Sequence, residues 1–458
     1  MSGHMYSSEV CQQARKSRDH RFDGLFFVAV KSTGIYCRPI CPAPMAHEKN
    51  VSYFEHAYSA AAAGFRPCIR CRPDSAPGSY AWLGVETTAV RAKKLIDEGA
   101  LSHMSVEGLS NRLGISQRYL NKLFKRYYGT SPKQYVLYKQ CDLAKQLLQQ
   151  TQLPISQIAF ASGFNSLRRF NDAFSKLFSL NPSQFRKERA ISDTPIKLFM
   201  AFRPPYNWFA LHQFFSTRLI EPIEWLGERK YGRTYSLDEY TGSFTAHFDE
   251  VNHGFNVEIK INDIRGLHLV VANIRRVLDL DADPEFINQY LEANIPSGLI
   301  LEQGLRLPGI WDVFEAGIRA ILGQQVSVSA ARNLLCTLVK HKGLSGQSNE
   351  PLFPTANALQ NCEFEFFKMP GARKSALRSL AQYCVEHKNN DDLDTWLDIK
   401  GVGPWTVDYV KMRGQSNPDI YLGGDLGVKK AFAQCGSFDT QTCAPFRSYL
   451  TFHLWRTL

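Results

Sequence analysis

The chain has 458 residues, of which 44% are hydrophobic and 12% aromatic, so it is too long for one ordinary core and too apolar for a disordered protein. The formal net charge of +11 comes from the N-terminal part, because residues 1–190 hold 27 Lys and Arg against 13 Asp and Glu. This charge favours a polyanionic partner, although a solvated basic surface would give the same count. The sequence shows neither an apolar run of about 18 residues nor a secretory signal, so we expect a cytoplasmic protein without a membrane anchor.

Four of the eleven cysteines form two close pairs, Cys37 with Cys41 and Cys68 with Cys71. Paired thiolates on short loops are what a tetrahedral metal site requires, and a soft set of four sulfurs favours Zn²⁺ over Mg²⁺ or Ca²⁺. We therefore predict a zinc site made of these four residues. The spacing alone leaves open a purely structural zinc, since most sites of this kind are closed and inert.

The residues around the two pairs read FFVAVKSTGIYCRP at 26–39 and AGFRPC at 63–68. They resemble the N-terminal domain of the Ada family of alkylation-repair proteins, and we assign residues 1–76 to such a domain. The resemblance implies that Cys37 irreversibly accepts a methyl group from a DNA methylphosphotriester, and we expect Arg38 to contact DNA. A site of one Zn²⁺ and four thiolates carries a charge of −2, and methylation lowers it to −1. We therefore expect tighter DNA binding after repair.

After a predicted linker at 72–79, one pattern occurs twice: a helix, a glycine turn at Gly114 or Gly163, and a second helix. The motif SPKQY at 131–135 is echoed by NPSQF at 181–185. The duplication resembles the AraC-type DNA-binding domain, with two helix-turn-helix units, and we assign residues 84–190 to it. Such units place a recognition helix in the major groove, whereas a helical bundle that does not bind DNA is the alternative. The implied contact residues are Gln117, Arg118 and Asn121 in the first unit, and Asn165, Ser166, Arg168 and Arg169 in the second.

A second linker is predicted at 187–195. The segment that follows mixes a helical pattern at 208–219 with strand alternation at 254–261, which indicates a small α+β unit without an evident catalytic cluster. From Pro308 onward, helical periodicity dominates.

A hairpin between two helices is predicted where IKGVGPWT occupies 399–406. Gly401 and Gly403 flank one aliphatic residue, which predicts a tight turn, because glycine alone accepts the positive φ that such a turn requires, and Pro404 suits the first turn of the next helix. The free N–H groups of such a turn, at a helix N-terminus, form a site for a phosphate. A carboxylate, Asp425, follows in GGDLG at 423–427.

This hairpin, together with GQQVS at 323–327 and MPGARK at 369–374, looks like the AlkA group of helix-hairpin-helix DNA glycosylases. The resemblance implies a TBP-like α+β domain at 195–285 and an all-α glycosylase domain at 286–458. It makes Asp425 the catalytic aspartate, whose ionised carboxylate would stabilise positive charge on the sugar. It also implies DNA contacts by Gly401, Gly403 and Gln325, and a pocket for a flipped base made of Trp405, Tyr409 and Trp455.

The local sequence also supports less specific interpretations of these residues. Asp425 could be only the N-cap of the helix that follows, which is compatible with catalysis because a helix N-terminus favours a carboxylate. The pocket aromatics could be core residues. Trp405 stands where the lyase branch of the superfamily has a lysine, so we predict a monofunctional glycosylase. Lys400 and Val407-Asp408 depart from the group's usual residues, and Gln325 stands where some members have an apolar wedge.

The sequence as a whole resembles a fusion of Ada-type and AlkA-type proteins, with several domains that are mainly α-helical and partly α+β. We expect it to excise alkylated bases, to accept methyl groups and to regulate transcription. The alternative is a regulator whose glycosylase region is only a DNA clamp. The expected cofactor is Zn²⁺. The expected partners are double-stranded DNA, both alkylated and promoter DNA, and RNA polymerase, and we expect a monomer.

Overall fold

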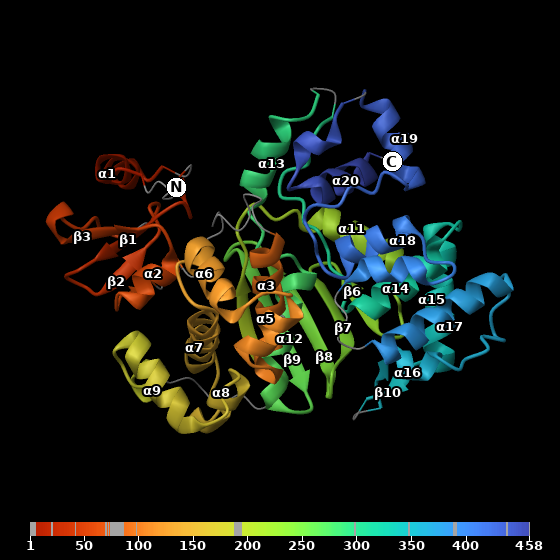
Figure 1. Ribbon diagram of the computed structural model, residues 1–458, viewed down its shortest axis with the longest axis horizontal. Helices are drawn as coiled ribbons and strands as arrows, with labels where there is room; N and C mark the ends of the chain where they lie inside the picture. The colour runs from red at the N-terminus through yellow and green to blue at the C-terminus, as the bar shows by residue number, and fades with distance from the viewer. Residues whose placement is uncertain are drawn as a thin grey trace. The chain divides into compact units, whose positions relative to one another are not determined.

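The computed structural model of the chain describes residues 6–19, 22–41, 43–68, 71, 73, 87–97, 99–186, 195–296, 299–346, 349–387, 392–436 and 438–457 (Figure 1). The predicted linkers at 72–79 and 187–195 lie outside these residues, apart from Pro73 and Pro195. The chain forms two compact units. One contains residues 1–192 and 264–272, and the other contains 193–263 and 273–458. The predicted class, a multidomain protein that is mainly helical with α+β parts, is confirmed.

The N-terminal part of the first unit is a small four-stranded sheet with two helices. Its elements are α1 (Ser8–Ser17), β1 (Phe27–Val30), β2 (Ile35–Cys37), β3 (Val51–Phe54), α2 (Ala57–Ala62) and β4 (Arg66–Pro67). The strand order is β3-β1-β2-β4, in which β4 runs parallel to β2 and the other pairs are antiparallel. The parallel pair brings the end of β2 beside the end of β4, and this places the two cysteine pairs next to each other.

The described residues that follow form the helices α3 (Thr87–Asp97), α4 (Ala100–His103), α5 (Val106–Arg112), α6 (Gln117–Tyr128), α7 (Pro132–Gln150), α8 (Ile155–Ala161), α9 (Leu167–Phe178) and α10 (Pro182–Phe185). The duplicated pattern is confirmed in its turns. Gly114 and Gly163 have φ values of 67° and 84°, which glycine adopts without steric cost. Ser116 and Ser166 then cap α6 and α9 by accepting the N–H groups of Tyr119 and Arg169.

The small sheet and the helices of the first unit share a buried aromatic contact. The hydroxyl groups of Tyr36, on β2, and Tyr138, on α7, form a hydrogen bond. Tyr58, on α2, packs edge-on against Tyr135 and Tyr138, with ring centroids 5.1 and 4.7 Å apart. Tyr36 immediately precedes Cys37, so the cysteine loop is joined directly to the long helix that connects the two helix-turn-helix units.

The second unit contains an antiparallel five-stranded sheet with the order β5-β9-β8-β7-β6. Its strands are β5 (Ile196–Ala201), β6 (Glu224–Gly227), β7 (Lys230–Leu237), β8 (Tyr240–Asp249) and β9 (Gly254–Ile261). Helix α11 (Trp208–Arg218) belongs to the same unit, whereas α12 (Leu267–Val277) is divided between the two units at residue 272. The ring of Phe215 on α11 stacks on that of Tyr231 on β7 at 4.2 Å. The prediction of a small α+β unit here is therefore confirmed.

The rest of the second unit is helical. Its helices are α13 (Pro284–Glu292), α14 (Val313–Gly323), α15 (Val328–Lys342), α16 (Ala356–Leu359), α17 (Gly371–Glu386), α18 (Pro404–Arg413), α19 (Leu426–Gln434) and α20 (Arg447–Arg456). A short hairpin of β10 (Leu344–Ser345) and β11 (Pro351–Leu352) departs from the expected all-α composition. Short strands of two residues leave no alternation that periodicity could detect.

A buried cluster of charges joins the sheet of the second unit to α14. Arg233 on β7 donates to Glu315 at 2.7 Å, and Arg319 donates to Glu315 and to Glu224 at 2.6 and 2.7 Å. Glu315 is fully buried, and the side chain of Arg319 is 10% exposed. Removing one member would leave a buried charge unpaired, which costs about 3–5 kcal/mol. The cluster therefore fixes how α14 lies against the sheet.

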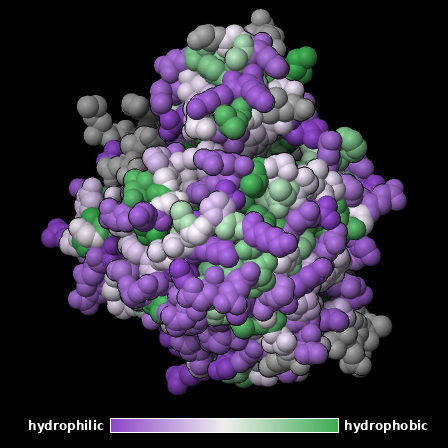
Figure 2. All heavy atoms as spheres, turned by 90° about the vertical axis from the view of Figure 1, so that its right-hand side faces the viewer, coloured by the Kyte–Doolittle hydropathy of each residue, from purple (hydrophilic) through white to green (hydrophobic). Residues whose placement is uncertain are grey.

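Two observations concern the surface. The side drawn at the right of Figure 1, where α15 and α17 lie, is mostly hydrophilic, and small hydrophobic patches are scattered among the hydrophilic residues (Figure 2). Among the described residues, no helix combines the length and the apolar composition needed to cross a bilayer.

Candidate functional site

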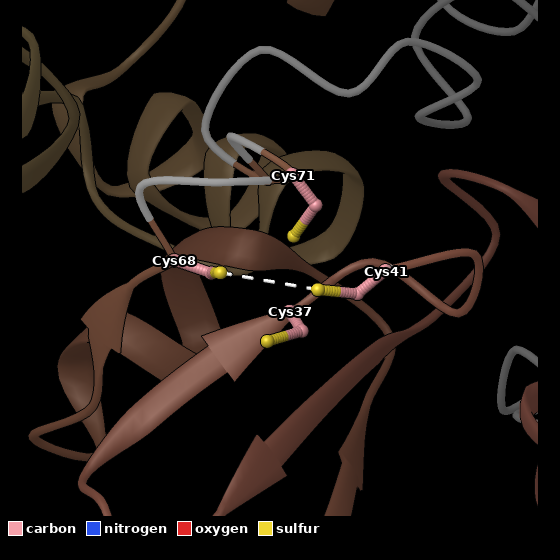
Figure 3. A group of neighbouring side chains, drawn as sticks. All are labelled: Cys37, Cys41, Cys68 and Cys71. Carbon is pink, nitrogen blue, oxygen red and sulfur yellow. Dashed lines mark hydrogen bonds between the residues drawn. The ribbon is translucent and has the colours of Figure 1, made fainter. Parts of the chain in front are cut away.

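The four predicted zinc ligands converge. Cys37 ends β2 and Cys41 lies in the turn that follows, while Cys68 follows β4 and Cys71 lies three residues later. Their sulfur atoms all lie within 4.8 Å of one another, and those of Cys41 and Cys68 are 3.9 Å apart (Figure 3). Zn–S bonds of about 2.3 Å in a tetrahedron place the sulfurs about 3.8 Å apart. The donor set and its spacing therefore fit Zn²⁺.

Arg38 contacts Cys71, one member of the second cysteine pair. Its backbone N–H donates to the Cys71 sulfur at 3.3 Å, and its guanidinium donates to the Cys71 carbonyl at 3.2 Å. The same guanidinium forms a bidentate ion pair with Asp23, in which Nε lies 2.7 Å from Oδ1. We predicted Arg38 as a DNA contact, and that role stays a prediction, since most of its donors are engaged within the protein. Asp23 carries no motif spacing, so sequence reasoning missed it.

The two glycines of the predicted hairpin have different backbone conformations. Gly401 has φ +94°, and a Cβ there would lie 2.8 Å from the Cβ of Ala376. Gly403, in contrast, has φ −110° and ψ 178°, so of the two glycines only Gly401 has the positive φ that the turn requires. A Cβ on Gly403 would meet nothing within 4 Å. The turn therefore requires glycine at position 401. Gly403 lies after the turn, as the N-cap of α18.

The hairpin exposes backbone donors and is tied to a neighbouring loop. Among the described residues, the N–H groups of Gly403 and Trp405 have no protein acceptor, as expected at a helix N-terminus. The Gln324 side chain donates to the Gly401 carbonyl at 3.0 Å and to the Thr406 hydroxyl at 3.1 Å. The next residue, Gln325, is exposed with φ +56°. Gln325 and the hairpin are therefore held beside each other, although they are far apart in the sequence.

Asp425 accepts three N–H groups. Its Oδ1 accepts from the backbone of Val428 and from the indole of Trp455, each at 3.1 Å. Its Oδ2 accepts from the indole of Trp405 at 3.3 Å. The carboxylate thus caps α19, as the local sequence indicates, and meets two of the three predicted pocket aromatics. Asp425 is therefore both the N-cap of α19 and the acceptor of the two pocket indoles.

The predicted pocket residues line one region at the edge of the core. The rings of Trp405 and Tyr409 stack with centroids 5.5 Å apart, and both side chains are partly buried against the core of the second unit. The ring of Trp455 stacks on that of Phe214 at 6.4 Å. Phe214 lies on α11, in the segment where the sequence indicated no catalytic cluster. No local signal distinguishes it from an ordinary core phenylalanine, and only the fold brings it here.

The predicted DNA-contacting residues of the first unit lie at the N-terminal ends of α6 and α9. Gln117, Arg118, Arg168 and Arg169 are exposed, and Asn121 is half-buried. Asn165 is exposed in the turn before α9, whereas the hydroxyl of Ser166 is engaged in capping that helix. These positions are those from which a helix entering a groove contacts bases.

Three parts of the chain match known families. Residues 10–74 match the metal binding domain of Ada, residues 109–188 match a helix-turn-helix domain, and residues 197–312 match the AlkA N-terminal domain. The resemblances predicted from the sequence are confirmed by these matches.

Curated relatives cover the chain in whole or in part. A Mycobacterium tuberculosis protein, named a probable bifunctional transcriptional activator/DNA repair enzyme AlkA, is 32% identical over 98% of this chain and 96% of its own length. Escherichia coli DNA-3-methyladenine glycosylase 2 is 30% identical over 56% of this chain and 95% of its own length. The Escherichia coli bifunctional transcriptional activator/DNA repair enzyme Ada is 40% identical over 26% of this chain and 33% of its own length.

Proposed function

Because this chain belongs to the family of bifunctional transcriptional activator/DNA repair enzymes of the Ada–AlkA type, we propose a specific task for each of its sites. The protein is an alkylation-repair enzyme and a transcriptional regulator. We assign methyl transfer to residues 1–76, promoter binding to 84–190, and base excision to the α+β and helical parts at 195–285 and 286–458. The observation that carries the glycosylase assignment is Asp425, which is held by the indoles of Trp405 and Trp455.

In base excision, the hairpin binds the DNA backbone and the flipped base enters between the pocket aromatics. The N–H groups of Gly403 and Trp405 receive a phosphate. As the C1′–N bond breaks, its electron pair goes to the base, and the carboxylate of Asp425 stabilises the positive charge left on the sugar. Water then adds to C1′ and loses a proton to solvent, which leaves an abasic site. Since position 405 is a tryptophan and not a lysine, no Schiff base forms there.

The test compares wild type with Asp425→Asn on a duplex that contains methylated purines. The amide keeps the N-cap and the size of the side chain but removes the negative charge. We expect unchanged DNA affinity and a loss of base release of about 100-fold or more. Free base is measured by chromatography, and binding by fluorescence anisotropy. If the wild-type protein binds the duplex but releases no base, the glycosylase region is only a DNA clamp. If borohydride traps a covalent protein–DNA adduct, the assignment as a monofunctional glycosylase is wrong.

Methyl transfer is assigned to Cys37. Zn²⁺ held by Cys37, Cys41, Cys68 and Cys71 would keep their sulfurs deprotonated at neutral pH. The Cys37 sulfur forms a bond to the methyl carbon of the phosphotriester, the methyl C–O bond breaks, and its electron pair goes to the phosphate oxygen. Arg38, which is paired with Asp23, binds the Cys71 loop and so keeps Cys71 beside the methyl-accepting Cys37 during transfer. Support comes from the convergence of the thiols and the Ada match.

The test is incubation of the protein with DNA that carries isotopically labelled methylphosphotriesters. We expect one labelled methyl per chain, on Cys37, located by peptide mass spectrometry. Cys37→Ser should accept none, whereas Cys435→Ser, at a cysteine outside the cluster, should accept the full amount. A stable zinc site without transfer would restore the structural interpretation.

For DNA reading we propose that α6 and α9 enter the major groove, with Gln117, Arg118, Asn121, Arg168 and Arg169 among the contacts. The name of the relatives as transcriptional activators supports a contact with RNA polymerase. We also propose that the protein acts in the cytoplasm as a monomer.

A further inference from the structure

Gln325 lies on a short exposed link between two helices. Helix α14 ends with Gln324 as its C-cap, and α15 begins after its N-cap Ser327, whose hydroxyl accepts a backbone N–H of that helix. The two residues between these caps, Gln325 and Val326, are both exposed. The mechanism above gives Gln325 no task, although the sequence predicted a DNA contact there.

The backbone of Gln325 has a conformation that glutamine rarely adopts. Its φ of +56° lies in the left-handed region, and the position directly after a helix C-cap usually holds glycine. A side chain there costs free energy that glycine would avoid, and the conformation persists only where neighbouring contacts fix the backbone. This chain thus places a side chain where the backbone alone favours none.

Contacts with the hairpin and with α17 fix that backbone. The side-chain amide of Gln324 donates to the Gly401 carbonyl at 3.0 Å and to the Thr406 hydroxyl at 3.1 Å. The Gln324 carbonyl accepts the guanidinium of Arg373 at 2.7 Å. Gly401 and Thr406 lie on either side of the N–H groups to which we assign a DNA phosphate. A duplex held by the hairpin therefore comes within reach of Gln325, the next residue along the chain.

The side chain of Gln325 is free to bind another molecule. Within the part of the chain that the structure describes, its amide forms no hydrogen bond. Two of the next three residues, Val326 and Val328, are apolar and 36% and 44% exposed. The tip of the loop thus combines apolar surface with an amide that offers one acceptor oxygen and two N–H donors.

We propose that the amide of Gln325 forms hydrogen bonds with the base opposite the flipped nucleotide, and so replaces the pairing that this base loses. The proposal rests on the glycosylase function assigned above. It names a contact on the undamaged strand, whereas Asp425 and the pocket aromatics act on the damaged strand.

The chemistry of the opposite base explains why an amide would matter. Flipping leaves the pairing edge of that base without a partner inside the duplex, where an unpaired polar group costs free energy. Thymine offers an N3–H donor beside a carbonyl acceptor, and cytosine offers an N3 acceptor beside an amino donor. A glutamine amide matches either edge with two hydrogen bonds, because turning it over exchanges its oxygen and its nitrogen. An aliphatic side chain would fill the same space and leave the edge unpaired.

The experiment measures binding to two duplexes that contain tetrahydrofuran, a stable abasic analogue. One carries thymine opposite the analogue, and the other carries 2,4-difluorotoluene, which has the shape of thymine but lacks its strong hydrogen-bonding groups. An excess of unlabelled undamaged duplex competes for other DNA-binding surfaces, so fluorescence anisotropy reports binding at the abasic position. We expect wild type to bind the thymine duplex about 10-fold more tightly, because the other duplex lacks two hydrogen bonds. A third duplex, with cytosine, should bind like the thymine duplex.

Two variants assign the difference to Gln325. Gln325→Met keeps an unbranched side chain of similar length without the amide, so it should bind the thymine and difluorotoluene duplexes with equal affinity. Gln382→Met is the matched control, because Gln382 is an exposed glutamine of the same unit whose amide donates to Glu386 at 3.0 Å. It should keep the wild-type difference. Equal melting temperatures of the three proteins show that neither substitution disturbs the fold.

Three results would overturn the proposal. In the first, wild type binds the thymine and difluorotoluene duplexes equally. In the second, Gln325→Met keeps the full difference, which would mean that another group contacts the opposite base. In the third, wild type binds neither abasic duplex better than the undamaged competitor. If wild type instead shows the difference through Gln325 but releases no base from methylated DNA, the contact stands and the glycosylase assignment is wrong.

Discussion

The carboxylate of Asp425 is oriented by two indoles that reach it from α18 and α20, while the start of α19 supplies a backbone N–H. The sequence predicted the N-cap from the residues that follow it, and the resemblance supplied the aromatics. Neither could reveal that Trp405 and Trp455 present their N–H edges to the acid, because that geometry depends on contacts 20 and 30 residues apart. At this scale, local chemistry was predictable and the orientation of side chains was not.

Trp455→Phe tests this orientation. The substitution keeps a ring that can stack on Phe214 but removes one hydrogen bond to a charged acceptor, worth about 1.5–3 kcal/mol. We expect base release in single-turnover assays to slow by about 10- to 100-fold with little change in DNA affinity. Trp225→Phe is the control, because its indole donates to Thr245 within the sheet. If both variants release base at the wild-type rate, the indole of Trp455 does not orient the acid.

At the scale of elements, the hairpin before α18 and helix α11 show what patterns can and cannot predict. Two glycines and a proline were enough to place the turn and the start of α18. They could not distinguish a glycine required by its φ, Gly401, from one with ordinary φ, Gly403. The contribution of α11 was missed because its apolar face is typical of a core helix, and its partner Trp455 comes more than 200 residues later.

Alanine substitutions at the two glycines should have different effects on stability. Gly401→Ala forces a methyl group against Ala376 in a strained backbone, so the melting temperature should fall by several degrees. Gly403→Ala has room and an ordinary φ, so stability should be unchanged. If phosphate approaches the N–H of Gly403, the added methyl group should nevertheless weaken binding of the glycosylase part to DNA about 10-fold. Calorimetry and anisotropy on the same samples separate the two effects, and unchanged binding by Gly403→Ala would refute the phosphate site.

For the molecule as a whole, the order of the modules followed from motifs whose chemistry is local, namely paired cysteines, duplicated turns and the hairpin. The interactions that join modules did not follow from them. Arg233 and Glu315 are buried and Arg319, which pairs with Glu315, is only 10% exposed, and no hydrophobic pattern would indicate such a cluster. The hydroxyl contact between Tyr36 and Tyr138 spans 102 residues and involves two residues that look like ordinary core tyrosines.

Methylation of Cys37 should change DNA affinity at this scale, because it lowers the negative charge of the zinc site by one unit. We expect the methylated protein to bind its promoter duplex more tightly than the unmethylated protein, and the difference to shrink as salt is raised. Titrations of both forms at matched ionic strength measure it. If both forms bind with equal affinity at low salt, the charge of the zinc site does not affect DNA binding.

The hydrogen bond between Tyr36 and Tyr138 has a thermodynamic consequence. Tyr36 is fully buried in a core that the small sheet shares with α7, and Cys37 is the next residue. We therefore expect the ordering of the cysteine loop to be coupled to the ordering of the first helix-turn-helix unit. If it is, a ligand of the thiols that stabilises the loop also stabilises the recognition helix, and by linkage a bound operator increases the affinity for that ligand by the same factor.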